Sequence, residues 1–122
     1  MQFVSKDYEL YGTWANPDYD DEIGNAAVNV FYPDGVVEMY YTTDQERLFD
    51  RLRYDITDRW TDREGNVWYT IIYIMSDESW AYELARISDS GKTYERKWSK
   101  YDDPEEMRTV NIGGDYEIRY RQ

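Results

Sequence analysis

The sequence predicts an all-β protein: an eight-stranded antiparallel barrel in up-and-down order, with a short N-terminal helical turn. Two observations lead to this fold class. Short segments rich in Tyr, Trp, Val and Ile recur along the 122 residues, and such residues favour strands. Turn signals separate the segments at short intervals, which is typical of a sandwich or a barrel. About eight strands is also the number that closes around side chains or one small ligand.

The elements follow from local pattern. Residues 2–10 carry Phe3, Val4, Tyr8 and Leu10, and we expect a helical turn there that covers one barrel end. Eight strands follow, joined by polar turns or by turns that contain Gly or Pro. The strands are expected over residues 11–16, 26–32, 36–43, 51–60, 67–75, 80–88, 93–99 and 116–121.

Several boundaries have specific causes. Pro17 ends the first strand because proline cannot donate to a ladder, and an acidic loop follows over residues 18–25. Pro33-Asp34-Gly35 is a strong turn signal between the second and third strands. Residues 43–50 are polar and could hold a helical turn. In the fourth strand alternate residues face opposite ways, with Leu52, Tyr54 and Ile56 on one face and Arg51, Arg53, Asp55 and Thr57 on the other.

The turn between the fifth and sixth strands decides which of their residues face inward. A two-residue turn at Asp77-Glu78 would pair Met75 with Trp80 and Tyr73 with Tyr82. A slip of one residue would exchange the inner and outer faces of the strand.

Two registers are open at the next hairpin. A two-residue turn at Ser90-Gly91 pairs Arg86 with Glu95. A three-residue turn with Gly91 in the left-handed conformation instead pairs Tyr82 with Trp98. Both sets of pairs are chemically sensible.

Composition limits the classes of function. The formal charge of −12 repels phosphate backbones and anionic lipid headgroups, so we expect no nucleic-acid partner. The chain has no Cys and no His, which argues against Ser-His or Cys-His catalysis, against Cys- or His-based metal sites, and for a protein that is not an enzyme. We expect no cofactor and no metal.

The simplest organisation is one domain over residues 1–122. No window approaches the ~20 apolar residues of a membrane span, and residues 1–7 lack the apolar core of a signal peptide. The compartment is unknown, and the sequence is also compatible with a trimmed extracytoplasmic or lipoprotein domain.

Gly12-Thr13-Trp14 on the first strand, the eight-strand meander and the arginines of the last strand resemble a lipocalin-like domain, a small barrel of the calycin type. The segments 60–62, 65–69 and 87–93 also resemble small bacterial lipocalin-like proteins. The resemblance implies that Gly12 and Trp14 form a structural signature. It also implies that a late basic residue, Arg119 or Arg121, packs across Trp14 and closes one barrel end.

The function expected from this fold is a binding module for a small hydrophobic or amphipathic ligand. The alternative is a filled barrel that serves as a structural or protein-interaction domain, with a protein partner unknown. Strand alternation gives the candidate ligand-binding residues: Met39, Tyr41, Tyr54, Ile56, Tyr73, Trp80, Tyr82, Leu84, Trp98 and Tyr120.

Charged clusters have simpler interpretations. The acidic runs 18–22 and 102–106 are most simply solvated loops, since the first lacks the Gly and Glu positions of a calcium loop. Arg51, Arg53, Arg59 and Arg63 are most simply a salt-bridged strand edge, and the alternative is a site for an anionic headgroup.

Overall fold

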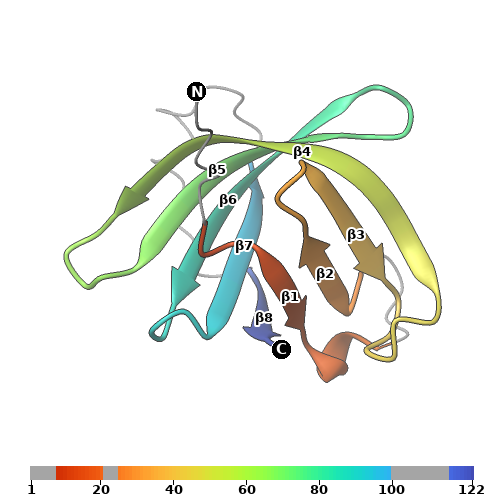
Figure 1. The fold of residues 1–122 in the computed structure, drawn as a ribbon, viewed down its shortest axis with the longest axis horizontal. Helices are drawn as coiled ribbons and strands as arrows, with labels where there is room; N and C mark the ends of the chain where they lie inside the picture. The colour runs from red at the N-terminus through yellow and green to blue at the C-terminus, as the bar shows by residue number, and fades with distance from the viewer. Residues whose placement is uncertain (1–7, 21–24, 100–115) are drawn as a thin grey trace, which may run out of the picture.

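The computed structural model describes residues 8–20, 25–99 and 116–122. They form a closed antiparallel barrel in which each strand pairs with its sequence neighbours and β8 pairs with β1 (Figure 1). The predicted fold class is therefore confirmed. The strands are β1 Gly12–Ala15, β2 Val28–Phe31, β3 Val36–Tyr40, β4 Leu48–Thr61, β5 Val67–Ile74, β6 Trp80–Ser88, β7 Thr93–Ser99 and β8 Glu117–Arg121, and a 3-10 helix, η1, spans Pro17–Tyr19.

A turn before β1 closes one end of the barrel. Most of the predicted helical turn, residues 2–7, lies outside the described residues. From Tyr8 onward the chain turns, and the Tyr11 amide donates to the Tyr8 carbonyl at 3.1 Å. Leu10 is fully buried, and the Trp14 indole donates to the Leu10 carbonyl at 2.8 Å. The turn at residues 8–11 thus covers one end of the barrel.

The two late arginines take different positions. The Arg121 guanidinium lies 4.1 Å from the centroid of the Trp14 ring and donates to the Tyr11 carbonyl at 3.1 Å. Gly12 has φ +125°, and a Cβ there would lie 3.0 Å from Arg121 Nη1. A side chain at Gly12 would therefore strain the backbone and crowd this arginine. Arg119 is buried further along the barrel and contacts other groups.

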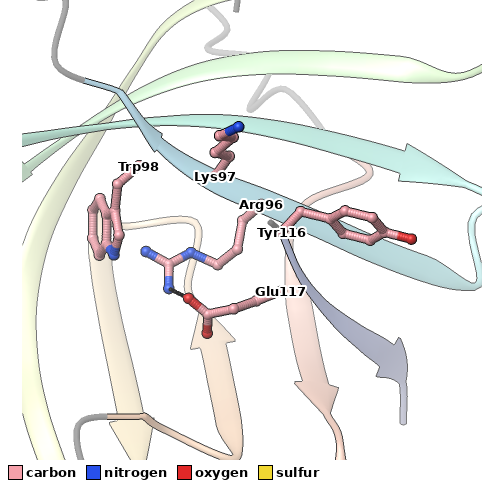
Figure 2. Close-up of a pocket in the computed structure, with 5 residues that line it drawn as sticks. All are labelled: Arg96, Lys97, Trp98, Tyr116 and Glu117. Carbon is pink, nitrogen blue, oxygen red and sulfur yellow. Dashed lines mark hydrogen bonds and ion pairs between the residues drawn. The ribbon is translucent and has the colours of Figure 1, made fainter. Parts of the chain in front are cut away.

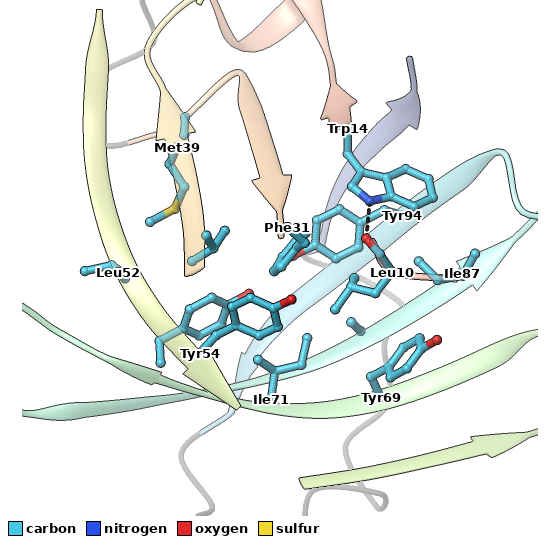
Figure 3. Close-up of a cluster of buried hydrophobic side chains, with 14 residues drawn as sticks. Leu10, Trp14, Phe31, Met39, Leu52, Tyr54, Tyr69, Ile71, Ile87 and Tyr94 are labelled. Carbon is cyan, nitrogen blue, oxygen red and sulfur yellow. Dashed lines mark hydrogen bonds between the residues drawn. The ribbon is translucent and has the colours of Figure 1, made fainter. Parts of the chain in front are cut away.

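Aromatic and aliphatic side chains fill the interior beyond this closed end (Figure 3). The Phe31 ring meets Tyr54 and Tyr94 edge to face, with centroids 5.2 and 5.6 Å apart. Edge-to-face contacts of this kind stabilise packed aromatic rings. The largest buried apolar side chains of this core are Leu10, Trp14, Phe31, Tyr69, Ile71, Tyr73, Ile87 and Tyr94.

The predicted register between β5 and β6 is wrong by one residue. Trp80 pairs with Ile74, rather than with Met75, and Tyr73 pairs with Ala81. The cause is a three-residue loop, residues 76–78, in which Glu78 adopts φ +69° and the Met75 amide donates to the Ser79 carbonyl. The slip exchanges the two faces of β6.

The β6–β7 hairpin has the first of its two predicted registers, with Arg86 paired with Glu95. Its four-residue turn, residues 89–92, is closed by Ser88 and Thr93.

In β4 the predicted alternation holds to Ile56, after which the register with β5 shifts at Thr57. This β-bulge turns Arg59 inward, opposite Tyr69.

Glu9 connects the N-terminal turn to the barrel wall through hydrogen bonds. Its carboxylate accepts hydrogen bonds from Arg59 Nε at 3.1 Å and from the Tyr69 hydroxyl. The pKa of Glu9 is lowered to about 2, mainly by the hydrogen bond from the Arg59 guanidinium and to a smaller extent by the one from the Tyr69 hydroxyl. These two effects outweigh the partial burial of Glu9, which acts in the opposite direction. Burial, together with the Glu9 carboxylate, raises the pKa of Tyr69 well above its usual value.

We expect Trp14→Ala to lower the free energy of unfolding by about 3–5 kcal/mol, the usual cost of a large-to-small core change.

A double-mutant cycle measured by chemical denaturation should give a coupling of about 0.5–2 kcal/mol between Trp14 and Arg121. The same cycle with Arg119, which lies over Tyr19 instead, should give less. Equal coupling at both arginines would contradict this closure.

We expect Glu9→Gln to destabilise the protein at pH 7 and to lose its effect in acid. Because folding lowers the pKa of Glu9 from 4.5 to about 2, its contribution is full above pH 4.5 and disappears as the pH falls through 2. Urea denaturation of both proteins between pH 7 and pH 2 checks this. A stability difference that does not shrink over this range would argue against the Glu9–Arg59 pair.

Candidate functional site

A partly enclosed cavity of about 200 Å³ lies at the end of the barrel opposite Trp14. Strand ends surround it: the end of β3, the start of β4, the end of β7 and the start of β8 all contribute side chains. Figure 3 shows two of its lining residues, Met39 and Leu52, on the side of the core away from Trp14. Among the described residues, the apolar lining is Ala26, Met39, Phe49, Leu52, Met75 and Trp98, and the polar lining is Asn25, Asp50, Arg96 and Glu117.

Strand pairing explains how these side chains meet. Met39 pairs with Asp50 across β3 and β4, so both project to the same face of the sheet. That face is the interior, because Met39 and Leu52 belong to the buried core. On β7, Trp98 pairs with the buried Glu83 and therefore also projects inward.

A second hollow of about 420 Å³ adjoins the cavity and is more open to solvent (Figure 2). It shares Arg96, Trp98 and Glu117 with the cavity and adds Lys97 and Tyr116. Trp98 is 47% exposed, and its ring meets Tyr73 edge to face at 5.5 Å. An exposed tryptophan thus forms the wall between the two spaces.

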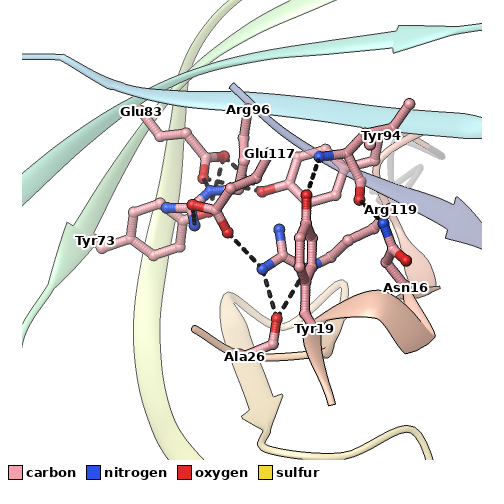
Figure 4. Close-up of polar contacts among 10 residues, drawn as sticks. Asn16, Tyr19, Ala26, Tyr73, Glu83, Tyr94, Arg96, Glu117 and Arg119 are labelled. Atoms are coloured by element: carbon pink, nitrogen blue, oxygen red, sulfur yellow. Dashed lines mark hydrogen bonds and ion pairs between the residues drawn. The ribbon is translucent and has the colours of Figure 1, made fainter. Parts of the chain in front are cut away.

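A buried ion network forms the floor of the cavity (Figure 4). Glu83 is fully buried and accepts hydrogen bonds from the hydroxyls of Tyr73 at 3.0 Å and Tyr94 at 2.9 Å. Arg96 Nε also donates to Glu83. The Arg96 guanidinium lies 4.0 Å from the centroid of the Trp98 ring. The cavity wall and the buried glutamate are therefore joined through one arginine.

Glu117 extends the network to β8. Its carboxylate accepts from Arg96 Nη1 at 3.1 Å and from Arg119 Nη2 at 2.7 Å. Arg119 also donates from Nη2 to the Ala26 carbonyl at 2.6 Å, which ties the network to the segment before β2. Arg119 Nη1 is buried without an acceptor among the described residues, and the guanidinium lies 5.2 Å from the Tyr19 centroid.

The surroundings keep Tyr73, Tyr94, Arg96 and Glu117 in their usual charge states. Burial raises the pKa of Tyr73 and of Tyr94, so both hydroxyls remain donors. Burial acts against ionisation of Glu117, but Arg96 and Arg119 outweigh it and lower the pKa of Glu117. Burial likewise opposes the charge on Arg96, but Glu83 raises its pKa above the usual value. Two carboxylates thus balance two guanidinium groups.

Five of the predicted ligand-binding residues project into the barrel, but only two of them line the cavity. Met39 and Trp98 do so. Tyr54 and Tyr73 are buried in the filled core, and Ile56 packs against it. The Tyr54 hydroxyl is occupied, since it donates to the Tyr32 carbonyl at 2.6 Å.

The other five predicted residues lie elsewhere. Trp80, Tyr82 and Leu84 pair with Ile74, Ile72 and Thr70 on the outer face of the sheet, because of the β5–β6 register. Trp80 is accordingly 60% exposed. Tyr120 lies outside because its neighbours Arg119 and Arg121 project inward, and Tyr41 is exposed and packs on Phe49 with ring centroids 4.9 Å apart.

Sequence reasoning missed most of the cavity lining. Leu52 shares a face with Tyr54, so its alternation could have identified it. Phe49 and Met75 lie at strand ends, where alternation carries little information. Asp50, Arg96 and Glu117 are charged, and a pattern that places apolar residues inside cannot find them.

The four clustered arginines do not line the cavity. Arg51, Arg53 and Arg63 are exposed, and Arg51 approaches Glu38 at 3.9 Å. Arg59 pairs with Glu9 at the closed end. Their positions do not form a single anion-binding site.

Comparison with known proteins gives no relatives. The chain matches no family model, and no curated protein or solved structure is significantly similar to it. No helix among residues 8–20, 25–99 and 116–122 is long and apolar enough to cross a membrane. Within the same ranges, no three or more Asp and Glu side chains group in a way that could hold a metal ion.

We expect Arg96→Met to destabilise the protein by about 3–5 kcal/mol, because it leaves Glu83 buried without its ion pair. Arg51→Met is the control, since Arg51 is exposed and approaches the partly exposed Glu38 at 3.9 Å on the outer face. That control should cost about 1 kcal/mol or less. Chemical denaturation measures both, and equal costs would contradict the role given to the buried network.

Proposed function

We propose that the protein is a non-enzymatic binding module that holds one small amphipathic molecule at the open end of its barrel. The cavity of about 200 Å³ is the observation that carries this proposal. Met39, Leu52, Met75 and Trp98 offer an apolar wall, while Arg96 and Glu117 offer polar groups at one side. A few polar groups in a mostly apolar pocket are typical of small-molecule sites.

The cavity volume limits the size of the ligand. Drug-sized ligands occupy pockets of about 300–1,000 Å³, whereas an apolar cavity of about 150 Å³ holds benzene. A space of about 200 Å³ therefore suits a single ring, or a short chain, that carries one small polar group. A long acyl chain cannot extend from the cavity into the barrel, because aromatic side chains fill the interior below.

We also propose that the barrel is lipocalin-like. Three features support this: the up-and-down order of eight strands, Trp14 on the first strand, and Arg121 across its ring. The absence of His and Cys supports a binding role over a catalytic one. The competing proposal, a filled barrel that binds a protein partner, is supported by the packed core and by exposed Trp80.

The test uses 2-phenylethanol, a neutral ring compound with one hydroxyl group. We expect it to bind wild-type protein with a Kd of about 1 mM or tighter, an affinity within reach of a ligand of this size. Ligand-observed NMR and calorimetry measure the binding, and a change in total tryptophan emission, to which Trp98 contributes, provides a second readout.

Met75→Trp should abolish this binding, because the larger side chain fills the cavity that Met75 lines. Ile74→Trp is the matched control: it places the same side chain one residue away on the outer face, where Ile74 is 37% exposed. Ile74→Trp should bind like the wild type. A folded wild type that binds no small ring compound would favour the filled-barrel alternative.

A further inference from the structure

The charges around the cavity are unequal. Glu83 and Glu117 are balanced by Arg96 and Arg119 within the buried network. Asp50 is a further carboxylate on the cavity wall. The charged side chains of this network and of the described cavity lining therefore sum to one negative charge.

Asp50 has no cationic partner in the described part of the chain. One of its oxygens accepts the Arg51 amide at 2.8 Å. The neighbouring basic side chains, Arg51 and Arg53, project to the outer face of β4 and are exposed. Arg96 lines the same cavity but is held by Glu83 and Glu117. Asp50 thus faces the cavity with its charge unmatched.

The network disfavours an anionic ligand. Among the described residues that line the cavity, Arg96 is the only cation, and it already donates to Glu83 through Nε and to Glu117 through Nη1. A carboxylate or phosphate would have to compete with these two carboxylates, and drawing Arg96 away would leave the fully buried Glu83 without its ion pair. A cation meets no such obstacle, because it can pair with Asp50 directly.

Aromatic side chains favour a cation as well. Trp98 already has the Arg96 guanidinium 4.0 Å from its ring centroid. Phe49, on the opposite strand wall, packs against Tyr41, which has Arg47 at 5.3 Å. Aromatic faces attract cations, and the overall charge of −12 raises the local concentration of cations around the protein.

We propose that the ligand is a small organic cation, a primary amine on a single ring or short chain, whose ammonium group pairs with Asp50. Its apolar body lies against Leu52, Met75 and Trp98. This inference rests on the proposed function, since it assigns a ligand class to the same cavity.

The test compares three ligands with the same ring and nearly the same size: 2-phenylethylamine, 2-phenylethanol and phenylacetate. At pH 7 the first is a cation, the second is neutral and the third is an anion. We expect the amine to bind about tenfold tighter than the alcohol, the gain when a charge-assisted hydrogen bond replaces a neutral one. Phenylacetate should bind weakest.

Asp50→Asn should remove the advantage of the amine over 2-phenylethanol, so that the two ligands bind this variant with similar affinity. Asp55→Asn is the matched control, because it removes one negative charge from the outer face of the same strand. It should keep the preference for the amine. Calorimetry at low salt measures all three ligands, and denaturation confirms that both variants are folded.

The outcomes separate the two proposals. If 2-phenylethanol binds and the amine binds no tighter, or if the advantage survives Asp50→Asn, the cation proposal is overturned while the binding function stands. If phenylacetate binds tightest, the cation proposal is also overturned. If none of the three binds the folded wild type, both proposals fail.

Discussion

The buried ion network determines how this small barrel divides its interior. Charged groups withdrawn from water must be paired, and leaving one unpaired is costly. Glu83 on β6 can pair with Arg96 on β7 only when these two strands keep their register. Glu117 on β8 also pairs with Arg96, so β8 must keep its register with β7 as well. On one side of the network aromatic side chains fill the lumen, and on the other side a cavity remains. The network thus lies at the boundary between the filled end and the open end of the barrel.

The strand pattern was predictable from the sequence because apolar alternation and turn residues recur at short intervals. Two strands, β6 and β7, have their predicted bounds, and the others differ at their ends. The register of β5 and β6 was not predictable, because it depends on Glu78 in the left-handed conformation. That conformation is uncommon for any residue but glycine, and no residue in this turn signals it. One backbone angle therefore decided whether Trp80 or Ala81 faces inward.

The candidate site was less predictable than the fold, for a related reason. Alternation identifies a face of a strand but gives no position along the barrel axis, so Tyr54 in the filled core and Leu52 at the cavity have the same pattern. It also assumes an apolar interior, whereas Asp50 and Arg96 are charged and project inward. By contrast, the sequence left two arginines of the last strand as candidates for packing across Trp14. Arg121 is the one that does so, and it passes close to Gly12, which has no side chain to block it.

The seam between β1 and β8 has a consequence for how the molecule folds. Among the described residues, two pairs are in register between these strands, Trp14 with Arg121 and Ala15 with Tyr120, and the Gln122 amide donates to the Thr13 carbonyl at 2.9 Å. Asn16 adds a hydrogen bond to the Ile118 carbonyl, 102 positions away. Contacts between residues so distant in sequence require a long loop to close, and they form slowly. We therefore expect the barrel to close at this seam last and to open there first, so that exchange of its amides reports opening of the cylinder rather than global unfolding.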